Sequence, residues 1–235
     1  GVTVCQEACG RTKLFLCAYH GWSYDIDGNL AGVPWRDGQS EAFDPKDWGL
    51  IQVPRVDSYR GFIFASFDRD AVPLPDHLGN ARPFLDYVVD LAPEGEIELT
   101  SGVFKYSYEG NWKQQVENSM DGYHPAVTHR SFFQVLGRRI DKGAGAVLEQ
   151  FGYDGAATSQ AGYLGNGHAI LDLRHVDRSK MMGAGIDPAV EAAFRESVID
   201  RLGEERGREI LSFRGGDGFN LLVYPNLILI NVQVR

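Results

Sequence analysis

Two groups of cysteine, histidine and carboxylate side chains in this chain have the spacing of metal ligands. The first is the pair Cys17 and His20 in the segment Cys-Ala-Tyr-His, which Gly21 and Trp22 follow at once. A Cys-x-x-His pair in a turn allows a thiolate and an imidazole to reach one metal from a single tight loop. The pair therefore marks a candidate metal-binding loop in the first part of the chain.

Three interpretations of this pair are open from the residues alone. The simplest is a core cysteine beside an unrelated histidine. The second is a structural zinc site, for which Cys5, Cys9, Cys17 and His20 supply the four ligands, although Cys5-x₃-Cys9 is not a strong spacing. The third is half of a Rieske [2Fe–2S] centre, in which two histidines replace two cysteines on one iron. Such a centre takes one Cys and one His from each of two loops, and this sequence holds one such loop.

The second group contains His124 and His129, with Asp121 three residues before the first of them. Histidines five residues apart lie about 140° apart on a regular α-helix, so they converge only where the helix ends or bulges. We expect Pro125 to supply that break, because the residue before a proline avoids the α region. Asp121 is placed to accept a ring N–H of His124 and to fix its tautomer. Two histidines and one carboxylate are the ligand types of non-haem Fe(II) oxygenases.

The elements that would carry these residues are short. Asp187 as N-cap and Pro188 as first helical residue predict a helix over 188–211. Patterning and turn residues predict further helices over 84–91 and 111–122, and strands over 13–17, 20–25, 59–67, 102–108, 168–173 and 219–234, whereas 137–167 is glycine-rich and weakly patterned. The predicted fold class is α+β, with a small β-rich part at the front.

Composition excludes several classes of protein. Hydrophobic residues make up 43% of the chain and charged residues 23%, as in ordinary globular proteins. The net charge of −9 argues against a nucleic-acid partner, which would require a basic face. No apolar run approaches the ~20 residues of a membrane helix, and nothing at the N-terminus resembles a signal peptide. We therefore expect a cytoplasmic protein with no membrane or nucleic-acid partner.

The segment from Cys17 to Leu30, Cys-Ala-Tyr-His-Gly-Trp-Ser-Tyr-Asp-Ile-Asp-Gly-Asn-Leu, closely resembles the second Rieske loop of the aromatic-ring-hydroxylating oxygenases, large (alpha) subunit. In that family the first loop reads Cys-x-His-Arg-Gly. If Gly1 is its closing glycine, the other two cluster ligands lie upstream of Gly1, and we interpret the chain as an internal fragment of a longer protein. The resemblance implies that Cys17 and His20 bind the [2Fe–2S] cluster and that Cys5 and Cys9 are ordinary side chains.

The second group resembles the same family. Its mononuclear iron site carries Glu-Asn-x-x-Asp-x-Tyr-His-x₄-His, which the sequence matches at Glu117, Asn118, Asp121, Tyr123, His124 and His129. The match implies that His124 and His129 are ligands of a non-haem Fe(II). It also implies that Asn118 and Asp121 are catalytic, Asp121 as the bridging acid to a Rieske histidine of a neighbouring subunit. The family's third ligand is an Asp that would lie beyond Arg235. Asp172 and Asp217 are nearer alternatives, but nothing around either of them matches the family.

The resemblance implies two domains, the C-terminal part of a Rieske domain over 1–55 and the N-terminal part of an antiparallel-sheet-plus-helices catalytic domain over 56–235. The implied function is the terminal component of a multicomponent dioxygenase that adds O₂ to an aromatic ring and gives a cis-dihydrodiol in aromatic catabolism. Electrons would come from NADH through a reductase or ferredoxin. The expected assembly is a homotrimer of alpha subunits, to which small β subunits can be added, and the fragment alone is expected to be inactive.

Two alternatives remain at this point. A Rieske monooxygenase or demethylase shares both motifs with the dioxygenases. A protein of a different class, a zinc-stabilised binding module without redox activity, would use the same first group of residues. The short spacing between Asn118 and Asp121 is most similar to the benzoate-type branch, which favours an aromatic acid as substrate.

Overall fold

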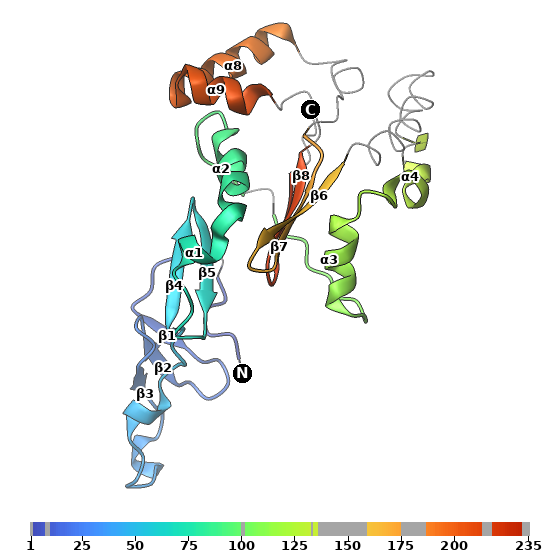
Figure 1. The fold of residues 1–235 in the computed structure, drawn as a ribbon. Helices are drawn as coiled ribbons and strands as arrows, with labels where there is room; N and C mark the ends of the chain where they lie inside the picture. The colour runs from blue at the N-terminus through green and yellow to red at the C-terminus, as the bar shows by residue number, and fades with distance from the viewer. Residues whose placement is uncertain are drawn as a thin grey trace. The chain divides into compact units, whose positions relative to one another are not determined.

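The computed structural model describes residues 2–7, 10–99, 102–132, 134–135, 159–174, 187–212 and 218–231 (Figure 1). They belong to two compact units. The first comprises Gly1–Asp57 and Ile63–Ala71, and the second comprises Ser58–Phe62 and Val72–Arg235. In the part of the chain that is described, no helix is long and apolar enough to cross a membrane.

The first unit is built on a three-stranded antiparallel sheet. Its strands are β1 (Leu14–Leu16), β2 (Ser23–Asp25) and β3 (Leu30–Gly32), and two 3₁₀ turns follow, η1 (Arg36–Gly38) and η2 (Pro45–Trp48). The Asp25 carboxylate accepts the backbone N–H groups of Asp27 and Asn29 at 2.9 and 2.8 Å, which closes the β2–β3 turn. The predicted strand–loop–strand arrangement around Cys17 and His20 is confirmed.

The single strand predicted over 59–67 is wrong, because a hairpin lies there. Strands β4 (Arg55–Tyr59) and β5 (Phe62–Ser66) pair with each other across a two-residue turn of Arg60 and Gly61. Both turn residues have positive φ, 51° and 89°, the conformation of the tight turns that match the twist of a hairpin.

The second unit contains a four-stranded antiparallel sheet in the order β6 (Gln160–Gly165), β7 (His168–Asp172), β8 (Phe219–Val223) and β9 (Leu227–Asn231). Alternate residues of a strand point to opposite faces of its sheet. The ring of Phe219 lies 5.3 Å from that of Phe84, whereas its neighbour Asn220 donates a hydrogen bond to Ser119.

The helices therefore lie on both faces of this sheet (Figure 1). One face packs against the segment α1 (Leu74–Leu78), η3 (Gly79–Ala81) and α2 (Arg82–Asp90), and the other packs against α3 (Trp112–Met120). The predicted helices over 84–91 and 111–122 are thus confirmed, with small shifts of their ends. The buried core of this unit includes Leu78, Leu85, Tyr87, Val198, Ile210, Phe219 and Leu221.

The helix predicted over 188–211 is divided in two. Asp187 caps it as expected, accepting the Ala189 N–H at 2.8 Å, but α8 (Pro188–Leu202) ends at Gly203, and α9 (Glu204–Ser212) begins directly after it. Gly203 has φ 80° and ψ 162°, a conformation that excludes a continuous helix and that residues with a side chain rarely adopt.

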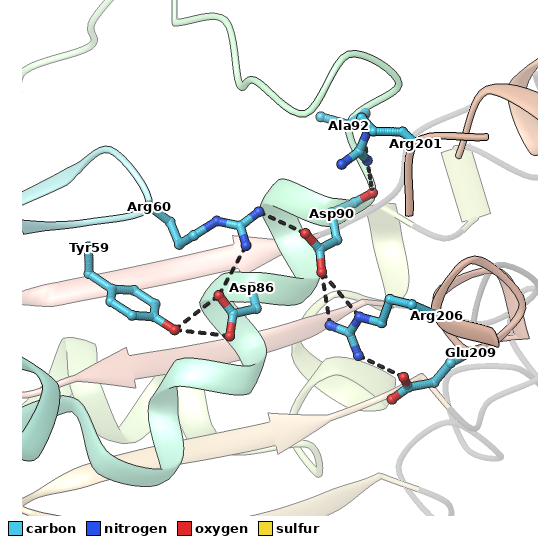
Figure 2. Close-up of polar contacts among 8 residues, drawn as sticks. All are labelled: Tyr59, Arg60, Asp86, Asp90, Ala92, Arg201, Arg206 and Glu209. Atoms are coloured by element: carbon cyan, nitrogen blue, oxygen red, sulfur yellow. Dashed lines mark hydrogen bonds and ion pairs between the residues drawn. The ribbon is translucent and has the colours of Figure 1, made fainter. Parts of the chain in front are cut away.

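A buried carboxylate joins three of these segments (Figure 2). Asp90, at the end of α2, accepts hydrogen bonds from Arg60 at 2.7 Å and from Arg206 of α9 at 2.9 Å. Arg201 of α8 donates to the backbone carbonyl of Ala92 at 2.8 Å, just after the same helix. Burial opposes ionisation of Asp90, but the two guanidinium groups outweigh it and lower the pKa of this carboxyl.

Two further strand predictions are wrong. The segment 219–234 is not one strand, because Tyr224, Pro225 and Asn226 form the turn between β8 and β9. Residues 102–108 form no strand, since no described strand pairs with them, and Phe104 and Tyr106 are 95% and 83% exposed. A strand exists only where a partner accepts its backbone hydrogen bonds.

Candidate metal centres

The second candidate group lies at the end of α3 and the start of the next helix. Asn111 caps α3 by accepting the Lys113 N–H at 3.0 Å. The break between the helices is at Asp121, which is extended at φ −94° and ψ 106°. The prediction that Pro125 supplies the break is wrong, because His124 before it is helical, at φ −65° and ψ −28°, and Pro125 opens α4 (Pro125–Thr128). Proline suits that first position because the missing N–H has no partner there in any helix.

The two histidines flank this short helix. His124 is its N-cap residue and His129 its C-cap residue, and the centroids of their rings are 5.2 Å apart with a 61° angle between the ring planes. The structure therefore brings together the two side chains that the sequence predicts as iron ligands. Convergence results from the shortness of α4, since only four residues separate the pair.

Both nitrogens of the His124 ring are engaged. Nδ1 lies 3.0 Å from Asp121 Oδ2, and Nε2 lies 3.0 Å from the amide nitrogen of Asn118. An ionised carboxylate only accepts and an amide nitrogen only donates, so Nδ1 carries the proton and Nε2 carries the lone pair. The network selects the neutral tautomer whose Nε2 is free to bind a metal once the Asn118 amide withdraws.

Asp121 is held in its ionised form by the turn that it begins. The Tyr123 N–H donates to Oδ1 at 2.7 Å, and this bond is the main cause of the lowered pKa of the Asp121 carboxyl. Burial opposes the shift, and the hydrogen bond from His124 adds to it. The Asp121 side chain remains 45% exposed, so it is accessible from outside the turn. Asn118 and Asp121, the predicted catalytic residues, therefore both contact the same imidazole.

Close packing against the sheet fixes the position of the turn. Ser119, one residue after Asn118, is buried against the sheet, with 5% of its surface exposed. A Cβ atom on Gly122 would lie 3.1 Å from Leu171 of β7 and closer still to the Ser159 hydroxyl. The turn between α3 and α4 therefore has no room for a larger residue at Gly122.

The remaining carboxylates do not complete this site. Asp172 points to the opposite face of the sheet from α3 and forms two hydrogen bonds with Arg174, at 3.0 and 2.7 Å. Asp217 lies outside the described residues. Among the residues that the structure describes, no three His, Cys, Asp or Glu side chains are grouped so that they could hold a metal ion.

The first candidate group lies on a tight turn of the first unit. The Cys17 N–H donates to the Trp22 carbonyl at 2.8 Å, the Gly21 N–H donates to the Cys17 carbonyl at 2.9 Å, and Gly21 has φ 71°. Cys17 is a free thiol, and the ring of Tyr19 lies 3.9 Å from that of His20. Cys5 is also free and exposed, whereas Cys9 lies outside the described residues, so the four residues of the zinc alternative are not shown together.

An open pocket of about 400 Å³ lies between α3 and the β8–β9 turn. It is lined by Tyr108, Trp112, Gln115, Val116, Pro225, Asn226 and Ile228. That these residues line a pocket was not predicted from the sequence, although the four-residue spacing of Trp112 and Val116 places both on one side of α3. Phe132 and Val135, which follow His129, are 58% and 47% exposed.

Comparisons with known proteins agree with the geometry. Residues 96–232 match the family of the ring hydroxylating alpha subunit (catalytic domain). The chain is 33% identical to the 2-halobenzoate 1,2-dioxygenase large subunit of Burkholderia cepacia, with 100% of the chain and 49% of that protein covered. It is 35% identical to the toluate 1,2-dioxygenase subunit alpha of Pseudomonas putida, with 98% and 49% covered.

The solved structure of naphthalene 1,2-dioxygenase from Rhodococcus sp. bound to indole superimposes with a TM-score of 0.66 at 28% identity, covering 97% of this chain and 48% of that one. The chain thus spans about half the length of the curated relatives it matches. Its α+β fold of antiparallel sheets and helices is that of their catalytic domain. The chain belongs to the family of ring-hydroxylating dioxygenase alpha subunits, in which it matches the catalytic domain.

Proposed function

We propose that the protein is the terminal oxygenase component of a multicomponent dioxygenase that adds O₂ to an aromatic ring and gives a cis-dihydrodiol. The observation that carries the proposal is the His124 imidazole, held by Asp121 and Asn118 as the tautomer that presents Nε2 to a metal, with the His129 ring 5.2 Å away. The halobenzoate and toluate 1,2-dioxygenases among the relatives support an aromatic substrate, and an aromatic acid in particular.

The donor set at α4 fits a mononuclear Fe(II). His124 and His129 would hold the ion as two neutral imidazoles, and an Asp beyond Arg235 would complete the facial triad. The ion, when bound, supplies open coordination positions for O₂ beside the substrate. Asp121 keeps the Nδ1 proton in place and so orients the His124 ring. In this structure the Asn118 amide occupies Nε2 at 3.0 Å, and with iron held there it would be left as a hydrogen-bond donor at the edge of the site.

The turn at Cys17 and His20 would supply one half of a Rieske [2Fe–2S] centre, with the other two ligands upstream of Gly1. This assigns residues 1–55 to a Rieske domain and 56–235 to the catalytic domain. The cluster supplies single electrons that originate from NADH and arrive through a reductase or ferredoxin. Asp121 is exposed enough to accept a second hydrogen bond, from a Rieske histidine of a neighbouring subunit, which requires a ring such as a homotrimer, with or without β subunits. A dependence on NADH supports a cytoplasmic location for the protein.

Metal content in the full-length enzyme tests the proposal. We expect His124→Ala and His129→Ala to lose the mononuclear iron but to keep the visible spectrum of the cluster. Cys17→Ser should lose the visible spectrum of the cluster and keep the mononuclear iron. Asp200→Asn, an exposed change on α8, is the control and should change neither. Retention of full iron by both histidine variants would overturn the assignment.

The two alternative functions, a Rieske monooxygenase or demethylase and a zinc-stabilised module, differ from the dioxygenase in their product or in their metal content. With ¹⁸O₂, a dioxygenase places two labelled oxygen atoms in the product, whereas a monooxygenase or demethylase places one. A zinc-stabilised module would contain stoichiometric zinc and would remain colourless after anaerobic reconstitution with iron and sulfide. Either of these results would reject the proposed dioxygenase.

A further inference from the structure

An amide side chain from the sheet holds the end of α3. Asn220 lies on β8, and its Nδ2 donates to the backbone carbonyl of Ser119 at 2.8 Å, across 101 residues of sequence. The contact is partly buried, and Ser119 itself is almost fully buried. It joins the middle of the sheet to the residue that follows Asn118.

The Ser119 carbonyl needs this donor because α3 ends one residue later. In a continuous helix the N–H of Tyr123 would bond to it. Here the Tyr123 N–H donates instead to the Asp121 carboxylate at 2.7 Å, since the chain turns at Asp121. A buried carbonyl without a partner is unfavourable, and Asn220 supplies the missing N–H.

Among the described residues, the neighbours of Asn220 within the sheet are apolar. Its partners across the sheet are Leu171 and Ile230, and the next residue of β8 on the same face is Leu222. An apolar side chain would fit such a position better, apart from the Ser119 carbonyl. The amide is therefore directed at the end of α3 rather than at the core.

We infer that Asn220 is a positioning residue for the iron site, and this inference rests on the proposed function. Its hydrogen bond holds Ser119 in the last turn of α3, and Asp121 is two residues and His124 five residues after Ser119. Without it the turn shifts, and Asp121 no longer meets Nδ1 of His124 at 3.0 Å. The Nε2 lone pair of His124 then loses the orientation that it has beside the His129 ring, 5.2 Å away.

Anaerobic titration of the metal-depleted full-length enzyme with Fe²⁺ tests the inference. We expect Asn220→Leu, which keeps the branching and the number of heavy atoms of the side chain but removes the donor, to bind Fe²⁺ about 10–100-fold more weakly, as is typical when a group that orients a metal ligand is lost. Asn220→Gln keeps a donor and should recover part of the affinity. The electron paramagnetic resonance spectrum of the Rieske cluster should be unchanged in both.

Ser119→Ala is the matched control. It removes the hydroxyl that bonds to the Gln115 carbonyl at 2.8 Å but leaves the backbone carbonyl that Asn220 contacts. We expect its Fe²⁺ affinity to stay within about twofold of the wild type. If the leucine variant does not fold, Asn220→Ser replaces it in the test. Its side chain is still polar but is too short to reach the Ser119 carbonyl, so we expect the same loss of Fe²⁺ affinity.

Two outcomes are distinguishable. If His124→Ala weakens Fe²⁺ binding but Asn220→Leu and Asn220→Ser bind as the Ser119→Ala control does, Asn220 has only a structural role and this inference fails alone. If His124→Ala itself binds Fe²⁺ as tightly as the wild type, the iron site is elsewhere, and the proposed function fails with it.

Discussion

Asp121 accepts the Nδ1–H of His124 at 3.0 Å, and this bond links two helices, since Asp121 is the C-cap residue of α3 and His124 is the N-cap residue of α4. Both side chains are partly exposed, 45% for Asp121 and 22% for His124, so the pair contributes little to stability. Its importance lies in orientation, because the proton on Nδ1 leaves a lone pair on Nε2, the atom that accepts from the Asn118 amide here and that would bind a metal in its place.

Replacing the carboxylate should therefore affect metal binding and not folding. In Asp121→Asn an amide N–H can face Nδ1, which favours the tautomer with its proton on Nε2 and blocks the ligand atom. We expect Fe²⁺ affinity in the full-length enzyme to fall about 10–100-fold. Thermal unfolding should match that of the Asp200→Asn control, and an unchanged affinity would show that Asp121 does not orient His124.

A buried histidine on the other face of the sheet predicts a pH dependence of stability. His168 has no exposed surface; its Nε2 donates to the His77 carbonyl at 2.7 Å, and its Nδ1 accepts the Tyr224 N–H at 2.9 Å. Burial lowers the pKa of His168 below the ordinary value of 6.5. The unfolded chain then binds more protons in this range, so the stabilisation is complete above about pH 6.5 and is lost as the pH falls below it.

Urea unfolding between pH 5 and pH 8 measures this effect. His168→Gln cannot titrate, so we expect a smaller loss of stability on acidification than in the wild type. At pH 8 the variant should be less stable by about 1–3 kcal/mol, because one of the two hydrogen bonds is left unmade. Parallel pH profiles for the two proteins would show that His168 does not cause the dependence.

The carboxylate at the end of α2 should be important for stability. Asp90 is 6% exposed and contacts Arg60 and Arg206, whose side chains are 34% and 36% exposed. Because both cations keep some water, we expect Asp90→Ala to cost about 2–3 kcal/mol rather than the larger cost of breaking a fully buried pair. Denaturant unfolding checks the value.

An exposed ion pair provides the control for Asp90. Glu204 and Arg208 pair on α9 with side chains 61% and 74% exposed. Glu204→Gln should change the free energy of unfolding by no more than about 0.5 kcal/mol. Equal effects of the two substitutions would mean that burial of Asp90 does not matter.

The division of α8 from α9 rests on backbone conformation. Gly203 has φ 80° with no atom within 4 Å of the place where a Cβ would stand, so Gly203→Ala tests the backbone alone. We expect Gly203→Ala to lower the free energy of unfolding by about 1–3 kcal/mol. Gly38 has the same free space for a Cβ atom but no positive φ. Gly38→Ala should therefore change the free energy of unfolding by no more than about 0.5 kcal/mol. Calorimetry of both variants compares them directly.

One missed strand had a local signal. β6 lies in the glycine-rich segment 137–167, for which the weak pattern predicted no strand. It is joined to β7 by Asn166 and Gly167, which have φ 52° and 82°. Asn-Gly is the preferred pair for such a hairpin turn. The pattern of β6 itself is weak because it is the edge strand of the sheet, and Tyr163 on it is 76% exposed.

The sequence by itself determined the family and the candidate residues of the proposed iron site, because ligand types and their spacing are properties of the local chain. It also determined helices with clear caps, such as those begun by Asn111 and Asp187. Only the tertiary structure decided where the chain turns and what holds it. The break at Asp121 and the hydrogen bond from Asn220 to Ser119 depend on packing between segments about a hundred residues apart, and no local pattern records which distant donor will satisfy a buried carbonyl.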